Sequence, residues 1–120
     1  MPVLGNDLGL EVVSGDGWDC LHVTGELDIY SNHLLRGLVQ MESLVADVLI
    51  LDLSGVTFLD SSGIGSIAFT MREVGARGAE LALVTDTNHL LKLVRMAGLH
   101  KLVAVYPSVE NAVSELSDVG

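Results

Sequence analysis

Runs of apolar residues separated by glycine-rich turns predict five strands along this chain. Segments 8–13 and 18–24 flank a Ser-Gly-Asp-Gly turn, and this arrangement predicts an antiparallel hairpin because Asp-Gly supplies the positive φ angles of a tight turn. Segment 47–53 is almost continuously apolar, which is typical of a strand covered on both faces. Segments 80–85 and 102–105 are also apolar and complete the set.

Apolar residues at helical spacing predict four helices between and after these strands. The first spans about 31–44 with Ser31 as its N-cap, and the others span about 61–74, 87–97 and 108–116. The apolar stripe of the first helix consists of Leu34, Leu38, Met41 and Val45.

The order of these elements predicts an α/β fold, with a mixed sheet of about four to five strands packed with about four helices. We expect one domain over residues 1–120, with its core at about 8–117. Segments 25–28 and 54–57 are predicted to be loops, because glycine and polar residues interrupt the apolar pattern there.

The second helix follows an Asp-Ser-Ser-Gly sequence, residues 60–63, and a helical wheel divides its residues into two faces. The predicted core face consists of Ile64, Ile67, Ala68, Met71 and Val74. The predicted exposed stripe consists of Ser62, Ser66, Phe69 and Glu73. This pattern places Ser62 at the solvent end of the stripe.

Two interpretations of the double serine are compatible. Asp60 or Ser61 can cap the helix by accepting a backbone N–H of the first turn. Ser62 can be offered to solvent as a modifiable hydroxyl. A phosphate there would add about 1.5 to 2 negative charges at a helix N-terminus that tolerates an anion, so it would alter an interface rather than the fold.

Charge narrows the possible partners of this chain, which has 6 Lys and Arg against 16 Asp and Glu and a net charge of −10. Phosphate backbones and anionic lipid require cationic groups for binding, so we expect neither nucleic acid nor membrane as a partner, and a basic protein surface fits better. The cations expected to be solvated rather than to form a binding patch are Arg72, Arg77, Lys92, Arg95 and Lys101.

Chemistry of other kinds has little support. Cys20 is the only cysteine and is expected to be a small buried side chain rather than a reactive thiol. The four histidines lack metal-ligand spacing, so we expect neither metal nor cofactor. No segment approaches the roughly 18 to 20 apolar residues of a membrane span, so a cytoplasmic location is expected.

Four stretches, residues 25–28, 48–65, 91–99 and 109–113, resemble the STAS domain of bacterial anti-sigma factor antagonists. The specific block is Leu-Asp-Leu-Ser-Gly-Val-Thr-Phe-Leu-Asp-Ser-Ser-Gly-Ile-Gly at 51–65. The resemblance implies a single STAS domain and a non-enzymatic regulator of transcription in stress response or sporulation.

The resemblance also implies partner switching. In this mechanism the unmodified antagonist binds an anti-sigma factor that is a serine kinase and releases the sigma factor, phosphorylation blocks binding, and a serine phosphatase resets the cycle. By motif position Ser62 is the phosphoacceptor, Ser61 is its neighbour, and Asp28 and Asp60 match acidic positions nearby. The motif and the exposed stripe together give the predicted partner-binding residues: Asp28, Asp60, Ser61, Ser62, Gly63, Ser66 and Phe69.

Other functions fit less well. Residues 63–68 match a dinucleotide fingerprint, but that motif requires its first glycine in the turn directly after a strand, and Gly63 lies ten residues beyond Leu53. A serine hydrolase would need a glycine two positions before Ser61 or Ser62, and neither has one. The main alternative is a STAS scaffold or assembly subunit of a stress-signalling or lipid-transport complex that is never phosphorylated.

Overall fold

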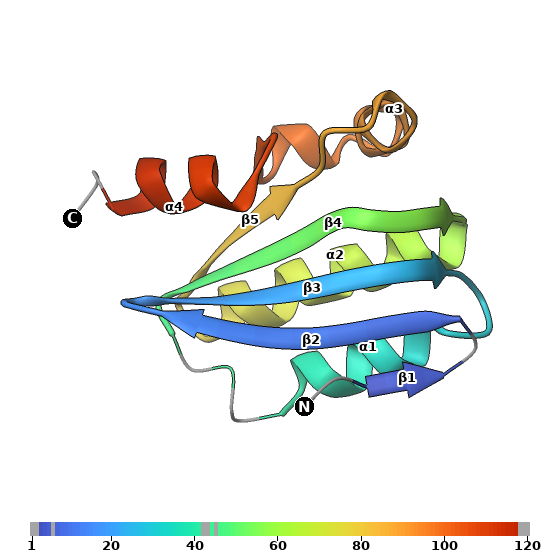
Figure 1. The fold of residues 1–120 in the computed structure, drawn as a ribbon, viewed down its shortest axis with the longest axis horizontal. Helices are drawn as coiled ribbons and strands as arrows, with labels where there is room; N and C mark the ends of the chain where they lie inside the picture. The colour runs from blue at the N-terminus through green and yellow to red at the C-terminus, as the bar shows by residue number, and fades with distance from the viewer. Residues whose placement is uncertain (1–2, 6, 42–43, 45, 118–120) are drawn as a thin grey trace.

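The computed structural model describes residues 3–5, 7–41, 44 and 46–117, and its strands form one six-stranded sheet in the order β1-β2-β3-β4-β5-β6 (Figure 1). The strands are β1 Val3–Gly5, β2 Leu8–Gly15, β3 Trp18–Leu27, β4 Val48–Leu59, β5 Glu80–Val84 and β6 Ala104–Tyr106. Strands β1, β2 and β3 pair antiparallel, whereas β3 to β6 run parallel. The sheet is therefore mixed, and its parallel half requires crossover helices.

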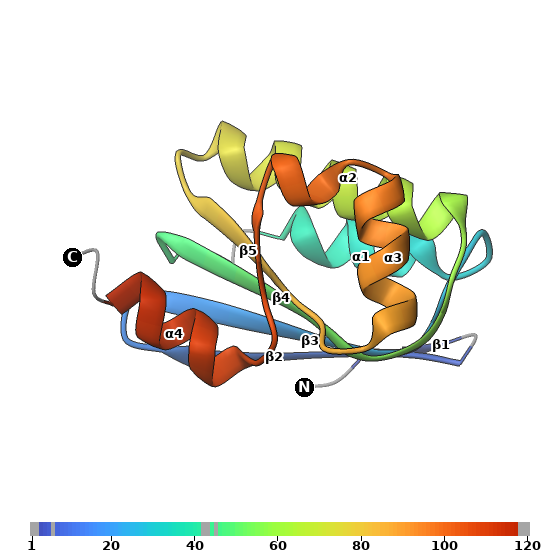
Figure 2. The ribbon, with the colours of Figure 1, turned by 90° about the horizontal axis from the view of Figure 1, so that it is seen from above.

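Figure 2 shows that the helices cover both faces of the sheet. The helices are α1 Asn32–Val39, α2 Ser61–Ala76, α3 Asn88–Met96 and α4 Val109–Ser117, with a 3-10 turn η1 at Leu99–Lys101. Helices α1, α2 and α3 lie together, and α4 covers part of the opposite face. This arrangement confirms the predicted α/β class. Among the described residues, no helix is long and apolar enough to cross a membrane.

Alternation along the strands divides the core into two layers. Leu51 and Leu83 belong to the larger buried cluster, which the helices α1, α2 and α3 complete. Ile50 and Val84, their neighbours in sequence, face the other way and pack with Ala112 of α4. The continuous apolar run of β4 therefore results from burial on both faces, as the sequence predicts.

The prediction of loops at residues 25–28 and 54–57 is wrong over most of their length. Strand β3 continues to Leu27 and β4 continues to Leu59, because these extensions pair with each other as parallel neighbours. Glycine permits this pairing: Gly25 has φ +86°, and a Cβ on Gly55 would lie 2.6 Å from the Thr24 side chain. The glycine-containing segments predicted as loops are therefore mostly strand residues, and they extend the sheet to the start of α2.

The first helix is shorter than its predicted span. Helix α1 ends at Val39, and its fully buried residues are Leu35 and Val39. Met41 of the predicted stripe is exposed, and Val45 lies outside the described residues. Leu34 and Leu38 of that stripe are half-buried against the core.

Strand β1 was not predicted, because a strand of three residues is too short to show a periodic pattern of apolar side chains. Thr87 caps α3, because its Oγ1 accepts the Leu90 N–H at 3.4 Å. After α3, Gly98 adopts φ +76°, the left-handed conformation that commonly ends a helix.

Candidate functional site

The end of β4 and the start of α2 are joined at Asp60, whose carboxylate makes two backbone contacts. Its Oδ1 accepts the Gly63 N–H at 2.9 Å and so caps α2. Its Oδ2 accepts the Ile29 N–H of the β3–α1 loop at 3.2 Å. Of the two predicted capping residues the structure therefore assigns the role to Asp60, and it ties the loop to the helix start with the same side chain.

The two serines that follow Asp60 are not needed to cap the helix. Ser61 is exposed and Ser62 is half-buried at the first turn of α2. Within the described part of the chain, neither hydroxyl makes a hydrogen bond. The first N–H groups of a helix lack intrahelical partners, so an anion on Ser62 would lie near unpaired donors and the positive end of the helix dipole.

The loop beside this helix start is built by Asp28. Its Oδ1 accepts the backbone N–H groups of Tyr30 at 2.9 Å and Ser31 at 3.1 Å. Ser31 is fully buried and its hydroxyl donates to the Glu26 carbonyl at 2.7 Å, so it holds the loop rather than capping α1 with its side chain. Asp28 and Asp60 therefore act as a pair, since one shapes the loop and the other anchors it.

Gly63 brings α2 close to the end of β3. A Cβ at this position would lie 2.3 Å from the Leu27 carbonyl oxygen and 2.6 Å from Leu59 Cδ1. No side chain fits such a gap without moving backbone. Gly63 is buried, so its place in the site is to let the helix start sit against the strands.

The predicted exposed stripe of α2 is wrong at Ser66. This residue is 0% exposed, and its hydroxyl donates to the Gly63 carbonyl at 2.6 Å. Thr70 is also buried and donates to the Ser66 carbonyl at 2.8 Å. Because these hydroxyls are satisfied by their own helix, they are buried at little cost, and a wheel that sorts residues by polarity misplaces them. A fully buried Ser66 side chain cannot touch a partner.

Of the predicted core face, Ile67 and Val74 are buried and the rest are half-buried. Phe69 is not an open ring on the surface. It packs against the main core, and the Arg36 guanidinium lies 5.1 Å from its ring centroid. Arg36 is itself fixed by donating to Asn32 Oδ1 at 3.0 Å. Phe69 therefore joins α2 to α1.

Three large apolar side chains around the helix start were not predicted from the sequence. Ile29 is 63%, Tyr30 73% and Phe58 48% exposed. Ile29 adjoins Asp60 through the hydrogen bond above, and Phe58 precedes Asp60 by two positions. We call Ile29, Tyr30, Phe58, Ser61 and Ser62 the Ser62 surface. The readable signal was the Ile-Tyr pair directly after Gly-Glu-Leu-Asp, in a segment with no strand or helix pattern.

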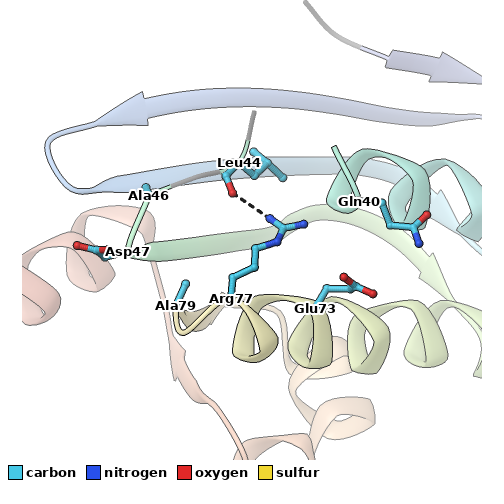
Figure 3. Close-up of a pocket in the computed structure, with 7 residues that line it drawn as sticks. All are labelled: Gln40, Leu44, Ala46, Asp47, Glu73, Arg77 and Ala79. Carbon is cyan, nitrogen blue, oxygen red and sulfur yellow. Dashed lines mark hydrogen bonds between the residues drawn. The ribbon is translucent and has the colours of Figure 1, made fainter. Parts of the chain in front are cut away.

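A cavity of about 640 Å³ lies at the other end of α2, beside Gln40, Asp47 and Glu73 (Figure 3). Arg77 points into this region but donates to the carbonyls of Leu44, at 2.9 Å, and Val39. Its guanidinium is thus occupied in holding the segment after α1 against α2. The cavity is about 22 Å from Ser62 along the helix, at 1.5 Å per residue, and is separate from the Ser62 surface.

A polar cluster lies on the face of the sheet that α4 covers only in part. His22 Nδ1 lies 2.6 Å from Asp52 Oδ2, and the other Asp52 oxygen accepts the Ser54 hydroxyl at 2.6 Å. Cys20 beside them is buried, and burial raises the pKa of its thiol to about 12. This confirms the prediction that Cys20 is a buried side chain. Among the described residues no three His, Cys, Asp or Glu side chains are grouped to hold a metal ion.

Comparison with known proteins assigns the class. The family model of the STAS domain matches residues 10–112, so the chain belongs to the STAS domain family, as its motifs indicate. It is 31% identical to the anti-sigma-B factor antagonist of Bacillus subtilis, over 78% of this chain and 85% of that protein. It is 28% identical to the anti-sigma F factor antagonist of Paenibacillus polymyxa, over 94% of this chain and 98% of that one.

A solved structure agrees with these relatives. The crystal structure of an anti-sigma factor antagonist from Mycobacterium paratuberculosis matches with a TM-score of 0.80 at 25% identity, covering 94% of this chain and 97% of that chain. The family resemblance inferred from the motifs is therefore confirmed.

Proposed function

We propose that this chain is an anti-sigma factor antagonist that works by binding rather than by catalysis. Its unmodified form binds an anti-sigma factor with serine kinase activity and releases the sigma factor. Phosphorylation of Ser62 by that kinase ends binding, and a serine phosphatase restores the unmodified form. The names of the relatives support the antagonist role.

The choice of Ser62 over Ser61 rests on motif position, and one observation supports a modifiable serine here. Asp60 supplies the cap of α2 and anchors the neighbouring loop, so the Ser62 hydroxyl has no structural hydrogen bond to lose within the described residues. It is a hydroxyl at an accessible helix start, and the adjoining loop and strand end carry exposed Ile29, Tyr30 and Phe58. Large apolar side chains near the centre of a contact region are typical of protein interfaces.

A phosphate at this position would act on the interface. The helix N-terminus stabilises negative charge, so the folded domain should keep its stability. A phosphate placed against a bound partner would instead be desolvated without a counter-charge, which costs on the order of 2–5 kcal/mol. That cost corresponds to roughly thirty-fold to several-thousand-fold weaker binding, at 1.4 kcal/mol per decade.

The test begins with capture of the kinase from native extract by the unmodified protein. The captured kinase is incubated with ATP and either wild type, Ser62→Ala or Ser61→Ala, and the products are mapped by mass spectrometry. We expect one phosphate on wild type and on Ser61→Ala, and none on Ser62→Ala. Phosphate on Ser61 alone, or no transfer to any variant, would contradict the proposal. No transfer combined with retained binding would support the STAS scaffold instead.

A further inference from the structure

The segment from Thr87 to Val109 differs in charge from the rest of the molecule. It contains Lys92, Arg95 and Lys101 and no Asp or Glu, so it carries +3. Since the whole chain carries −10, the remaining residues carry −13. Half of all Lys and Arg residues thus lie within α3 and η1.

Helix α3 exposes two of these three cations to solvent. Leu90 and Val94 are buried against the core, whereas Lys92, Arg95 and Met96 are exposed. Met96 is 74% exposed, so a large apolar side chain accompanies the two exposed cations of this helix. The outer face of α3 therefore combines positive charge with an apolar side chain.

The apolar character continues past the helix. Leu102 follows Lys101 directly and is 67% exposed. It lines a groove of about 550 Å³ whose other walls include Met71 of α2, Tyr106 of β6 and Leu116 of α4. Since β6 is the edge strand of the sheet in the described chain, this groove opens where the sheet ends.

Helix stability explains only part of this pattern. Cations near a helix C-terminus interact favourably with its dipole, and Arg95 lies in the last turn of α3. That effect is confined to the last turn and does not account for Lys92. It also does not account for the exposure of Met96 and Leu102.

We propose that Lys92, Arg95, Met96, Lys101 and Leu102 form a second protein-docking surface, which takes an acidic segment of a partner that carries apolar side chains. Carboxylates of that segment lie over the cations, and an apolar side chain enters the groove beside Leu102. This surface is separate from Ser62, because Met71 in the groove wall is about 13 Å along α2 from Ser62, at 1.5 Å per residue.

A protein segment fits better than a membrane. Charges are screened beyond about 8 Å at physiological ionic strength, so a narrow acidic segment interacts mainly with the local +3. An anionic bilayer is an extended plane, and it would also meet acidic parts of the other residues, which carry −13. The sequence alone favoured solvated cations, because it did not show that Met96 and Leu102 beside them in the chain are exposed.

The test is an NMR titration of the ¹⁵N-labelled protein with an acidic octapeptide, Glu-Glu-Leu-Glu-Glu-Leu-Glu-Glu, blocked at both ends. We expect shift changes confined to the backbone amides of residues 71–75 and 92–106. The same peptide with Lys for every Glu should leave these amides unshifted, although it can shift amides in the acidic remainder of the molecule. With the acidic peptide, shift changes elsewhere, or none at all, would overturn the proposal, as would vesicles of phosphatidylglycerol and phosphatidylcholine shifting these amides when the peptide does not.

Variants separate specific docking from general charge. Lys101→Gln and Leu102→Ser should each weaken peptide binding about two- to five-fold, as expected for one exposed pair or one exposed apolar contact. Thr57→Glu, an exposed site on β4, has the same net charge as Lys101→Gln and should change binding less than about two-fold. Equal weakening by Thr57→Glu and Lys101→Gln would overturn the proposal. Ser62→Asp should leave peptide affinity unchanged, so this result is independent of the phosphorylation test.

Discussion

Asp60 Oδ2 accepts the backbone N–H of Ile29 at 3.2 Å, across 31 positions of sequence. The other oxygen of the same carboxylate caps α2 through Gly63. One side chain therefore fixes the relative position of the helix start and of the loop that presents Ile29 and Tyr30. The Ser62 surface depends on this contact for its shape.

Replacing Asp60 should loosen both attachments. Asp60→Ala removes the cap and the loop anchor, and we expect a loss of about 1–2 kcal/mol in the free energy of unfolding. Asp60→Asn keeps an acceptor for the Gly63 N–H and should lose much less. Urea unfolding followed by circular dichroism measures both. Equal stability of wild type and Asp60→Ala would show that the contact does not hold the helix start.

Substitutions at two glycines of α2, Gly63 and Gly65, should have contrasting effects on stability. Gly63→Ala puts a Cβ 2.3 Å from the Leu27 carbonyl oxygen, and the backbone must shift. We expect about 1–3 kcal/mol of destabilisation, typical of overpacking. At Gly65 the nearest atom to a new Cβ is the flexible end of Arg36 at 3.3 Å, so Gly65→Ala should be neutral or stabilising by up to about 1 kcal/mol. Thermal melts of the two variants test this contrast, and equal melting temperatures would contradict it.

The ring of Phe69 serves stability more than binding. Because it is half-buried between α1 and α2 under Arg36, Phe69→Ala should lower the free energy of unfolding by about 2–3 kcal/mol, below the range for a fully buried ring. Phe69→Leu retains apolar volume and should lose less. Calorimetry gives the comparison. A Phe69→Ala protein that is as stable as wild type but binds its partner poorly would show that the ring belongs to the binding surface instead.

The Cys20 thiol gives a pH-dependent prediction. Its folded-state pKa is about 12 and its ordinary value is 9.0, so between these pH values the folded state keeps a proton that the unfolded state loses. The contribution of Cys20 to stability is therefore complete below pH 9 and falls as the pH rises toward 12. At pH 8 the folded thiolate fraction is about a thousandfold below that of an ordinary thiol. Disulfide-exchange reagents should modify the native protein much more slowly than the urea-unfolded protein, and equal rates would contradict the burial.

Periodicity predicted the fold class and most elements because buried strands and amphipathic helices leave local patterns. It failed at residues 25–28 and 54–57, since pairing between two glycine-containing segments is a long-range property. It failed at Ser66 because a hydroxyl bonded to its own helix can be buried without an apolar signature. The motif located Ser62, but only the three-dimensional contacts of Asp60 could show which residue caps the helix.

The exposed apolar residues of the Ser62 surface also could not be predicted from local sequence patterns. Ile29 and Tyr30 lie in a loop with no periodicity, and Phe58 lies in a strand extension that looks like a loop. The position of Ile29 and Tyr30 depends on the hydrogen bonds that their backbone N–H groups make with Asp60 and Asp28. Local sequence therefore gives the proposed acceptor serine but not its surroundings.

The central claim is that charge at Ser62 breaks an interface and leaves the fold intact. The most direct measurement is the dissociation constant for the captured kinase of wild type and Ser62→Asp, with a melting curve of each and Ser66→Asp as the buried control. We predict binding weakened at least about thirty-fold by Ser62→Asp with a melting temperature within about 2 °C of wild type, and severe destabilisation by Ser66→Asp. Unchanged binding by Ser62→Asp, or destabilisation as severe as that of Ser66→Asp, would contradict the account.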